Sequence, residues 1–154
     1  MNDRETRKQL IDMLTAPSAH LTFEKAIEKF TPEMQGRRLG GFPHTAWQIL
    51  EHLRIAQWDI LEFSRNPNHV SPDWPDGYWT KEGAPSDPKD WNKSAAAFIK
   101  NLNEMAALIE DPDNDLFEPF AHGDGQNLFR EACVLAKHNS YHIGQLAALK
   151  KGLK

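Results

Sequence analysis

The segment from Pro43 to Arg65 constrains the fold most, because it is a long helical pattern with apolar residues on both sides. Proline is tolerated in the first turn of a helix, and Asn66 and Pro67 mark a stop. One apolar stripe runs along this segment, and a second lies on the opposite side: Trp47, Leu50, Trp58 and Leu61. A helix that is apolar all round is buried on two sides. We expect one side to face a helical bundle and the other to be covered by a connector or by a second subunit.

Four further segments show apolar residues at helical spacing: 3–14, 22–30, 87–110 and 126–150. Asn2 or Asp3 can cap the first of these helices, and Asp87 with Pro88 can begin the third. Residues 31–42 form a connector, and 66–86 form a long aromatic, proline-rich loop. No segment shows a convincing strand pattern. The sequence therefore predicts an all-α fold, a four-helix bundle with one short extra helix and long loops, in a single domain spanning 1–154.

Composition excludes several classes of function. The net charge is −4, so the chain lacks the basic excess that binds a nucleic-acid backbone. No window approaches the roughly 18 apolar residues of a membrane span, and the charged N-terminus does not resemble a signal peptide. Cys133 is the sole cysteine, which rules out an intramolecular disulfide and fits a reducing compartment. We expect a cytoplasmic protein that binds neither nucleic acid nor membrane.

Histidines mark the candidate functional site. On the helix 126–150, His138 and His142 lie one turn apart, roughly 40° around the helix, on the face that points into the bundle. Two buried imidazoles are costly without partners, so the pair is either bonded to buried polar groups or bound to a metal. Two ligands rarely suffice for a metal site. His52 lies on the bundle side of the helix 43–65 and is the one further histidine within a long helix.

The other four histidines, at 20, 44, 69 and 122, fall in loops or at a helix start, and we interpret them as solvent-exposed groups. Cys133 lies roughly 140° around its helix from His138, which predicts an inert core thiol facing away from the site.

Two segments resemble the DinB-like superfamily of metal-binding four-helix bundles (also called DinB/YfiT-like): T-A-W-Q-I-L-E-H-L-R-I-A-Q-W-D-I-L-E-F at 45–63 and H-N-S-Y-H-I-G-Q-L at 138–146. The resemblance implies that His52, His138 and His142 bind one divalent ion, with water or an exogenous group completing the shell. It also implies a homodimer. Some members of this superfamily are thiol S-transferases that use bacillithiol, mycothiol or glutathione on small electrophiles. Three imidazoles suit zinc, nickel, iron or copper.

Three neutral imidazoles and an open position are typical of a catalytic metal site. Together with such a site, the resemblance implies a metal-dependent thiol S-transferase or a related enzyme acting on small electrophiles. Asp59 and Glu131 share the helix faces of the histidines. They are candidates for hydrogen-bond acceptors behind the ligands or for a general base; the alternative is that they are rim carboxylates with no such role. One alternative is a non-enzymatic metal-binding stress-response dimer, and another is a metal-independent interaction module.

Loop aromatics are candidates for the roof of the site, or alternatively pack over one end of the bundle: Trp74, Tyr78, Trp79 and His122. Near the histidine pair, Gly144 is a candidate for close helix approach. Gln145 is a candidate hydrogen-bond partner of a ligand histidine.

Overall fold

The fold is taken from a computed structural model that describes residues 3–154, so Asn2 lies outside it. Over these residues the chain is helical and forms no strand. The long helices are α1 (Asp3–Thr15), α4 (Ala46–Arg65), α5 (Asp90–Glu110) and α6 (Leu128–Gly152). Two short helices, α2 (Phe23–Ile27) and α3 (Pro32–Gly36), and the 3-10 turn η1 (Asp76–Tyr78) complete the elements.

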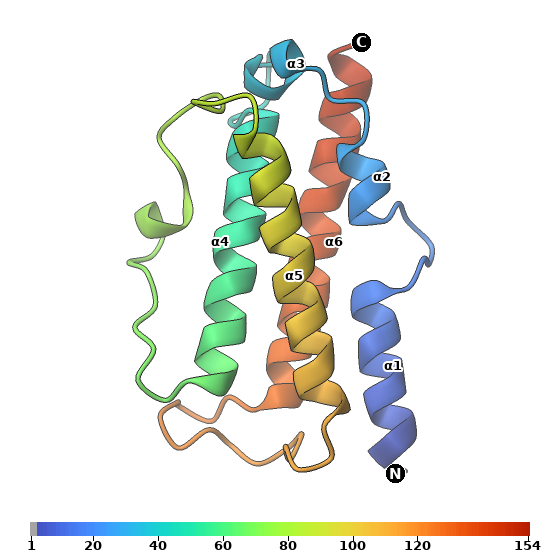
Figure 1. The fold of residues 1–154 in the computed structure, drawn as a ribbon, viewed down its shortest axis with the longest axis vertical. Helices are drawn as coiled ribbons and strands as arrows, with labels where there is room; N and C mark the ends of the chain where they lie inside the picture. The colour runs from blue at the N-terminus through green and yellow to red at the C-terminus, as the bar shows by residue number, and fades with distance from the viewer. Residues whose placement is uncertain (1–2) are drawn as a thin grey trace.

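The long helices pack as a four-helix bundle, which confirms the predicted class. Neighbouring pairs are α4 with α5, α5 with α1, α1 with α6, and α6 with α4. α2 continues beyond the end of α1 and packs against α6, so these two helices together occupy the fourth corner (Figure 1). The segment 66–86 runs along the outer side of α4, and the segment 111–127 closes the end of the bundle where α1 begins (Figure 1).

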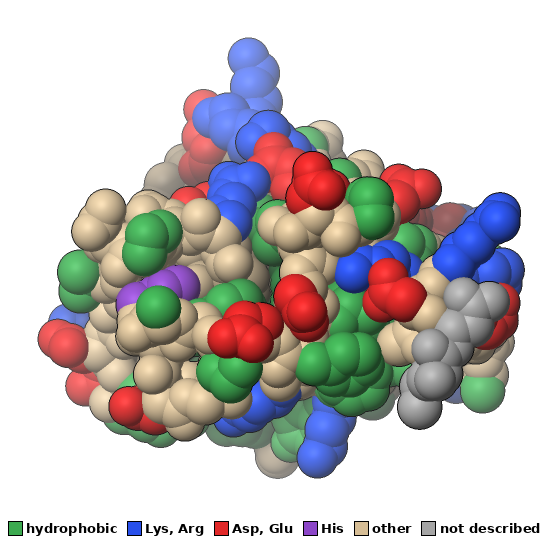
Figure 2. Space-filling model, turned by 90° about the horizontal axis from the view of Figure 1, so that it is seen from below, with side chains coloured by type: hydrophobic (Ala, Val, Ile, Leu, Met, Phe, Trp, Pro, Cys, Tyr) green, Lys and Arg blue, Asp and Glu red, His purple; other side chains and the backbone are tan. Residues whose placement is uncertain are grey.

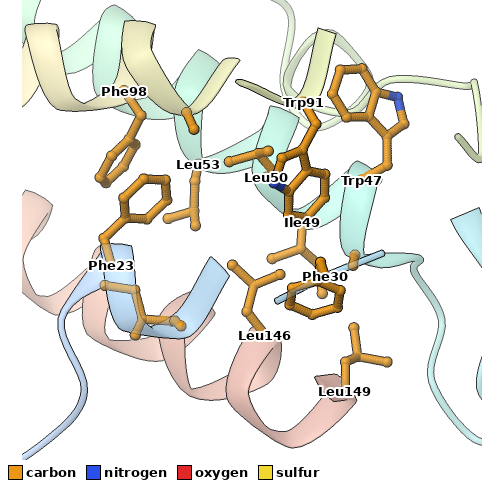
Figure 3. Packing of buried hydrophobic residues seen from close by; sticks show 14 of the residues in the cluster. Phe23, Phe30, Trp47, Ile49, Leu50, Leu53, Trp91, Phe98, Leu146 and Leu149 are labelled. Atoms are coloured by element: carbon orange, nitrogen blue, oxygen red, sulfur yellow. The ribbon is translucent and has the colours of Figure 1, made fainter. Parts of the chain in front are cut away.

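The core consists of two hydrophobic clusters along the bundle axis. The first, at the α2 end, contains Phe23 stacked on Phe98 with ring centroids 4.0 Å apart, and both rings are buried (Figure 3). The second, at the other end, contains Leu61, Met105 and other buried side chains of all four long helices. Large apolar side chains in both clusters supply most of the folding free energy, at roughly 25 cal/mol per Å² removed from water.

The helix that carries His52 begins later than the sequence pattern predicts. α4 starts at Ala46 rather than Pro43, because Thr45 forms a capping box with Gln48. The Thr45 hydroxyl oxygen accepts from the Gln48 backbone N–H, and the Gln48 side chain accepts from the Thr45 N–H. Such caps satisfy donors that the first turn leaves free.

Other boundaries also differ, each for a local reason. α2 ends at Ile27, and the chain turns at Lys29 with φ of 64°. The connector contains the unpredicted α3, which Thr31 caps. α5 begins at Asp90 rather than 87, because the Asp87 carboxylate accepts from the Lys89 N–H in a preceding turn. α6 begins at Leu128 rather than 126, after the cap residue 127.

The second apolar side of α4 is covered within the chain. Trp47, Leu50 and Leu61 are buried, while Trp58 retains 38% of its surface exposed. Trp47 and Leu50 belong to the first core cluster and Leu61 to the second. Of the two covers expected for this side, the connector, together with the bundle itself, buries most of it within the chain.

Charges of both signs are mixed on the face where α1 begins (Figure 2). No helix within residues 3–154 combines the length and the apolar character needed to cross a membrane.

Candidate metal centre

The three predicted histidines meet between α4 and α6. One ring nitrogen from each of His52, His138 and His142 lies within 4.8 Å of the others. His52 Nε2 is 3.0 Å from His138 Nε2. His52 and His142 are buried, with 3% and 7% of their surface exposed, and His138 is half-buried. Their convergence follows from the predicted spacing, since α6 presents two histidines one turn apart toward α4.

His52 is held by the loop that covers it. Its Nδ1–H donates to the backbone carbonyl of Tyr78 at 2.9 Å, which leaves Nε2 as the nitrogen with a lone pair. The indole of Trp79 stacks on the same imidazole, with centroids 3.9 Å apart and planes 1° from parallel. Trp79 also stacks on His44 at 3.8 Å, so the indole lies between two imidazoles. The loop therefore fixes both the tautomer and the plane of His52.

His142 is fixed from its own helix. Its Nδ1–H donates to Gln145 Oε1 at 2.7 Å, which confirms the predicted role of Gln145 and leaves Nε2 for a ligand. Tyr141 is 65% exposed, and its ring meets the His142 ring edge-on with the ring centroids 4.9 Å apart. His138 Nδ1 is buried and has no hydrogen-bond partner within the described residues.

The surroundings keep these rings neutral. Burial lowers the pKa of His52 to about 4 and that of His138 to about 4, and it lowers the pKa of His142 as well. Neighbouring imidazoles act in the same direction, because two cationic rings at this distance repel each other. A neutral imidazole is the form that binds a metal.

These residues fit a divalent ion. The donor set is three neutral imidazoles. In two of them Nδ1 bonds an oxygen acceptor, as in metal sites of proteins where such a second contact orients the ligand ring. The third has an orphaned Nδ1 beside the contact between the two Nε2 atoms, an arrangement that is costly without a ligand. Three nitrogen ligands leave further coordination positions open.

Asp59 lies behind the covering loop rather than beside the ligands. It follows His52 by seven residues, about 10 Å along α4. Its carboxylate accepts from the Tyr78 hydroxyl at 2.6 Å and bonds His69 Nε2 at 2.7 Å. The His69 side chain is 7% exposed, so its assignment as a solvent group is wrong. Asp59 thus anchors the residue whose carbonyl holds His52.

Glu131 is buried on α6, two turns before His138. Its carboxylate accepts from the Arg130 guanidinium. Burial raises its pKa, and the negative charge of Asp59 acts in the same direction. Neither carboxylate contacts a ligand histidine within the described residues, and a role as general base stays a prediction.

The structure separates the remaining candidates. Trp79 covers the site, whereas Trp74 is 75% exposed and contacts only the Tyr78 ring among the described aromatic residues. His122 bonds the carbonyl of Phe63, eleven residues beyond His52 on α4, so it does not roof the site. Gly144 has no neighbouring atom within 4 Å of a Cβ position, so the predicted close helix approach is wrong.

Two further interpretations are refined. His44 is half-buried against Trp79 rather than free in solvent, a contact that its position before the helix did not indicate. Cys133 is partly exposed rather than in the core, and lines a groove of about 620 Å³ between α1 and α6 together with His20. Burial still raises its pKa, as expected for an unreactive thiol.

The fold and site define a helical-bundle protein with a buried three-histidine cluster that could hold a metal ion. A sequence model of the DinB superfamily matches residues 18–146, and the chain belongs to this superfamily. The match includes both site-bearing segments. No curated protein and no solved structure matches the chain significantly.

Proposed function

We propose that the chain binds one divalent metal ion through Nε2 of His52, His138 and His142. The observation that carries the proposal is the commitment of Nδ1 in two of the rings. Because Tyr78 O and Gln145 Oε1 accept those protons, both rings present an unprotonated Nε2 to the same small volume. Zinc, nickel and iron all suit three imidazoles.

We further propose that the site activates a low-molecular-weight thiol for transfer to a small electrophile. A divalent ion with three neutral ligands keeps its charge near +2 and lowers the pKa of a bound thiol. The chain's own residues hold the ligand rings in place and shield them from water, since Trp79 covers His52. In the reaction the thiol proton passes to solvent and the sulfur bonds the electrophilic carbon. The displaced electron pair leaves with the halide of a haloaromatic, or stays on the oxygen of an opened epoxide or of a quinone, which then takes a proton from solvent.

Tyr141 is 65% exposed and His138 is half-buried, so a substrate would approach from their side of α6. The metal-loaded protein should be supplied with bacillithiol, mycothiol or glutathione and with epoxides, quinones and haloaromatics. Thiol-dependent turnover in wild type, lost in His142→Ala and kept in His122→Ala, is the expected result. Equal turnover in wild type and His142→Ala, or no turnover with any thiol, would contradict the enzymatic proposal.

The second candidate is a non-enzymatic metal-binding stress-response protein in which the ion serves folding. The burial of His52 and His142 favours this reading, because burial limits the access of water and substrate to the ion. It predicts metal-dependent stability without exchangeable water on the ion. Water relaxation measured on the nickel-loaded or manganese-loaded protein distinguishes an open coordination position from a closed one.

We also propose that the protein forms a homodimer. Because most of the second side of α4 is buried within the chain, the loop 66–86 becomes the candidate interface. Val70 and Trp74 on this loop are 83% and 75% exposed. Exposed apolar side chains of this size are typical of contact surfaces, since apolar surface in water is costly.

A further inference from the structure

A chain of buried amides crosses the core beside the histidine cluster. Gln57 Nε2 donates to the backbone carbonyl of Phe98 at 2.5 Å, and Asn139 Nδ2 donates to Gln57 Oε1 at 2.8 Å. Gln57 is fully buried and Asn139 is 6% exposed. This chain links α5, α4 and α6 in order.

The amides lie at the level between the two hydrophobic clusters. On α4, Gln57 stands midway between Leu53 of the first cluster and Leu61 of the second. On α6, Asn139 stands midway between Leu135 of the second cluster and Ile143 of the first. Two buried amides make the core less stable than apolar side chains of similar size would. Their presence therefore indicates a role other than packing.

The direction of the chain is fixed by its first acceptor. A backbone carbonyl can only accept, so the amide group of Gln57 that faces Phe98 must be the NH₂. Gln57 Oε1 therefore faces Asn139, and the NH₂ of Asn139 must face Gln57. Asn139 Oδ1 is left as an acceptor, buried and without a hydrogen-bond partner within the described residues.

The adjacent residue, His138, also has an unpartnered atom, and when protonated this atom would complement Asn139 Oδ1. His138 Nδ1 is also buried and also unpartnered within the described residues. His138 and Asn139 are consecutive residues of α6, so the two unpartnered atoms belong to the same turn of the helix, at the same level of the core. His138 thus has a potential Nδ1 acceptor, as His52 has in Tyr78 and His142 has in Gln145.

The contact between His52 and His138 explains why this bond is not made. His52 carries its proton on Nδ1, where it bonds Tyr78, so its Nε2 can only accept. At 3.0 Å the neutral His138 must therefore donate from Nε2. Its Nδ1 then has no proton and cannot donate to Asn139 Oδ1, because both atoms are acceptors.

We propose that Gln57 and Asn139 are positioning residues for the third metal ligand, and that metal binding switches His138 from the Nε2–H to the Nδ1–H tautomer. When His138 Nε2 serves as a ligand it gives up its proton. The neutral ring then carries one proton on Nδ1, which donates to Asn139 Oδ1. One proton leaves the ring and one returns from solvent, so the ring stays neutral. This inference rests on the proposed metal site.

The direct test follows the ring tautomers by long-range ¹H–¹⁵N correlation spectra of histidine-labelled protein, first with a chelator and then with zinc chloride. His138 should change from Nε2–H to Nδ1–H. His52 and His142 should remain Nδ1–H throughout and act as internal controls, because their acceptors do not change. A His138 ring that is already Nδ1–H without zinc, or still Nε2–H with it, would overturn the switch.

Variants test the amide chain itself. Asn139→Leu removes the acceptor at similar volume and should weaken zinc binding about 10- to 100-fold, measured by competition with a chromophoric chelator. The matched control is Ser140→Ala, on the next residue of α6, whose hydroxyl contacts the exposed His20 instead. This control should leave zinc affinity unchanged.

Gln57→Leu should also weaken zinc binding, because Asn139 is then free to rotate. Its control is Gln35→Leu, which removes another buried glutamine bonded to a backbone carbonyl, that of Phe30. Zinc affinity equal in wild type and Asn139→Leu would overturn the amide chain alone. Absence of zinc binding by wild type would overturn the proposed metal site together with this inference. If Asn139→Leu fails to fold, the tautomer measurement on wild type decides.

Discussion

Acidification should destabilise the metal-free protein well above the pH at which most carboxylates titrate. His52 and His138 have pKa values of about 4 in the folded protein, against 6.5 for an ordinary histidine. Between these pH values His52 and His138 are protonated in the unfolded chain and neutral in the folded chain. The contribution of these two histidines to the free energy of unfolding is therefore fully present above about pH 6.5. It is lost as the pH falls toward about 4.

The magnitude follows from the difference between the two pKa values. A change from 6.5 to about 4 corresponds to about 3 kcal/mol for His52. His138 adds a loss of the same order, and the two together are comparable with a large part of the usual folding free energy of about 5–15 kcal/mol. Glu131 acts in the opposite sense, because its raised pKa favours the folded state at lower pH.

The assay is urea unfolding with a chelator present, repeated from about pH 7.5 to about pH 4.5. The free energy of unfolding should fall by several kcal/mol in wild type. In His52→Leu the fall should shrink by about 2.5 kcal/mol, because the assay covers most of the interval between the two pKa values. In the control His20→Ala, which changes an exposed ring, it should match wild type. A wild-type stability that is flat across this range, or an identical slope in His52→Leu, would refute the reasoning.

Three further outcomes are expected. Tyr78→Phe should lower the free energy of unfolding by about 1–3 kcal/mol, because the Asp59 carboxylate loses the hydroxyl donor at 2.6 Å. It should weaken zinc binding only modestly, because the backbone carbonyl of residue 78 still accepts from His52. Added copper should quench part of the tryptophan fluorescence. This part should vanish in Trp79→Phe but persist in Trp74→Phe, since Trp79 stacks on His52 whereas Trp74 contacts Tyr78. Sedimentation should show a dimer at micromolar concentration that Trp74→Ser weakens, and a wild-type monomer would contradict the proposed assembly.

The fold and the three histidines could be predicted because both depend on spacing along single helices. Apolar residues at helical intervals located the long helices, and two histidines one turn apart necessarily share a face. His52 followed from its place on the bundle side of α4. These features depend on the 3.6-residue repeat and little on distant contacts.

The contacts that orient the ligands could not be predicted, because they come from backbone conformation and from neighbours distant in sequence. A helical repeat does not show that the carbonyl of Tyr78 reaches His52, or that His69 turns inward to Asp59. Likewise, the apolar pattern of α4 showed that two sides are buried, but not which segments cover the second side. Only the packed bundle supplies that answer.

Elemental analysis of the protein purified without an affinity tag tests the central claim most directly. Wild type should contain about one divalent ion per chain, because three neutral imidazoles form one site. His138→Ala should lose most of that metal. The control His122→Ala should keep it, because His122 is a loop residue that bonds the Phe63 carbonyl near the far end of α4. Full metal occupancy in a variant with all three ligand histidines replaced by alanine would contradict the assignment of this site.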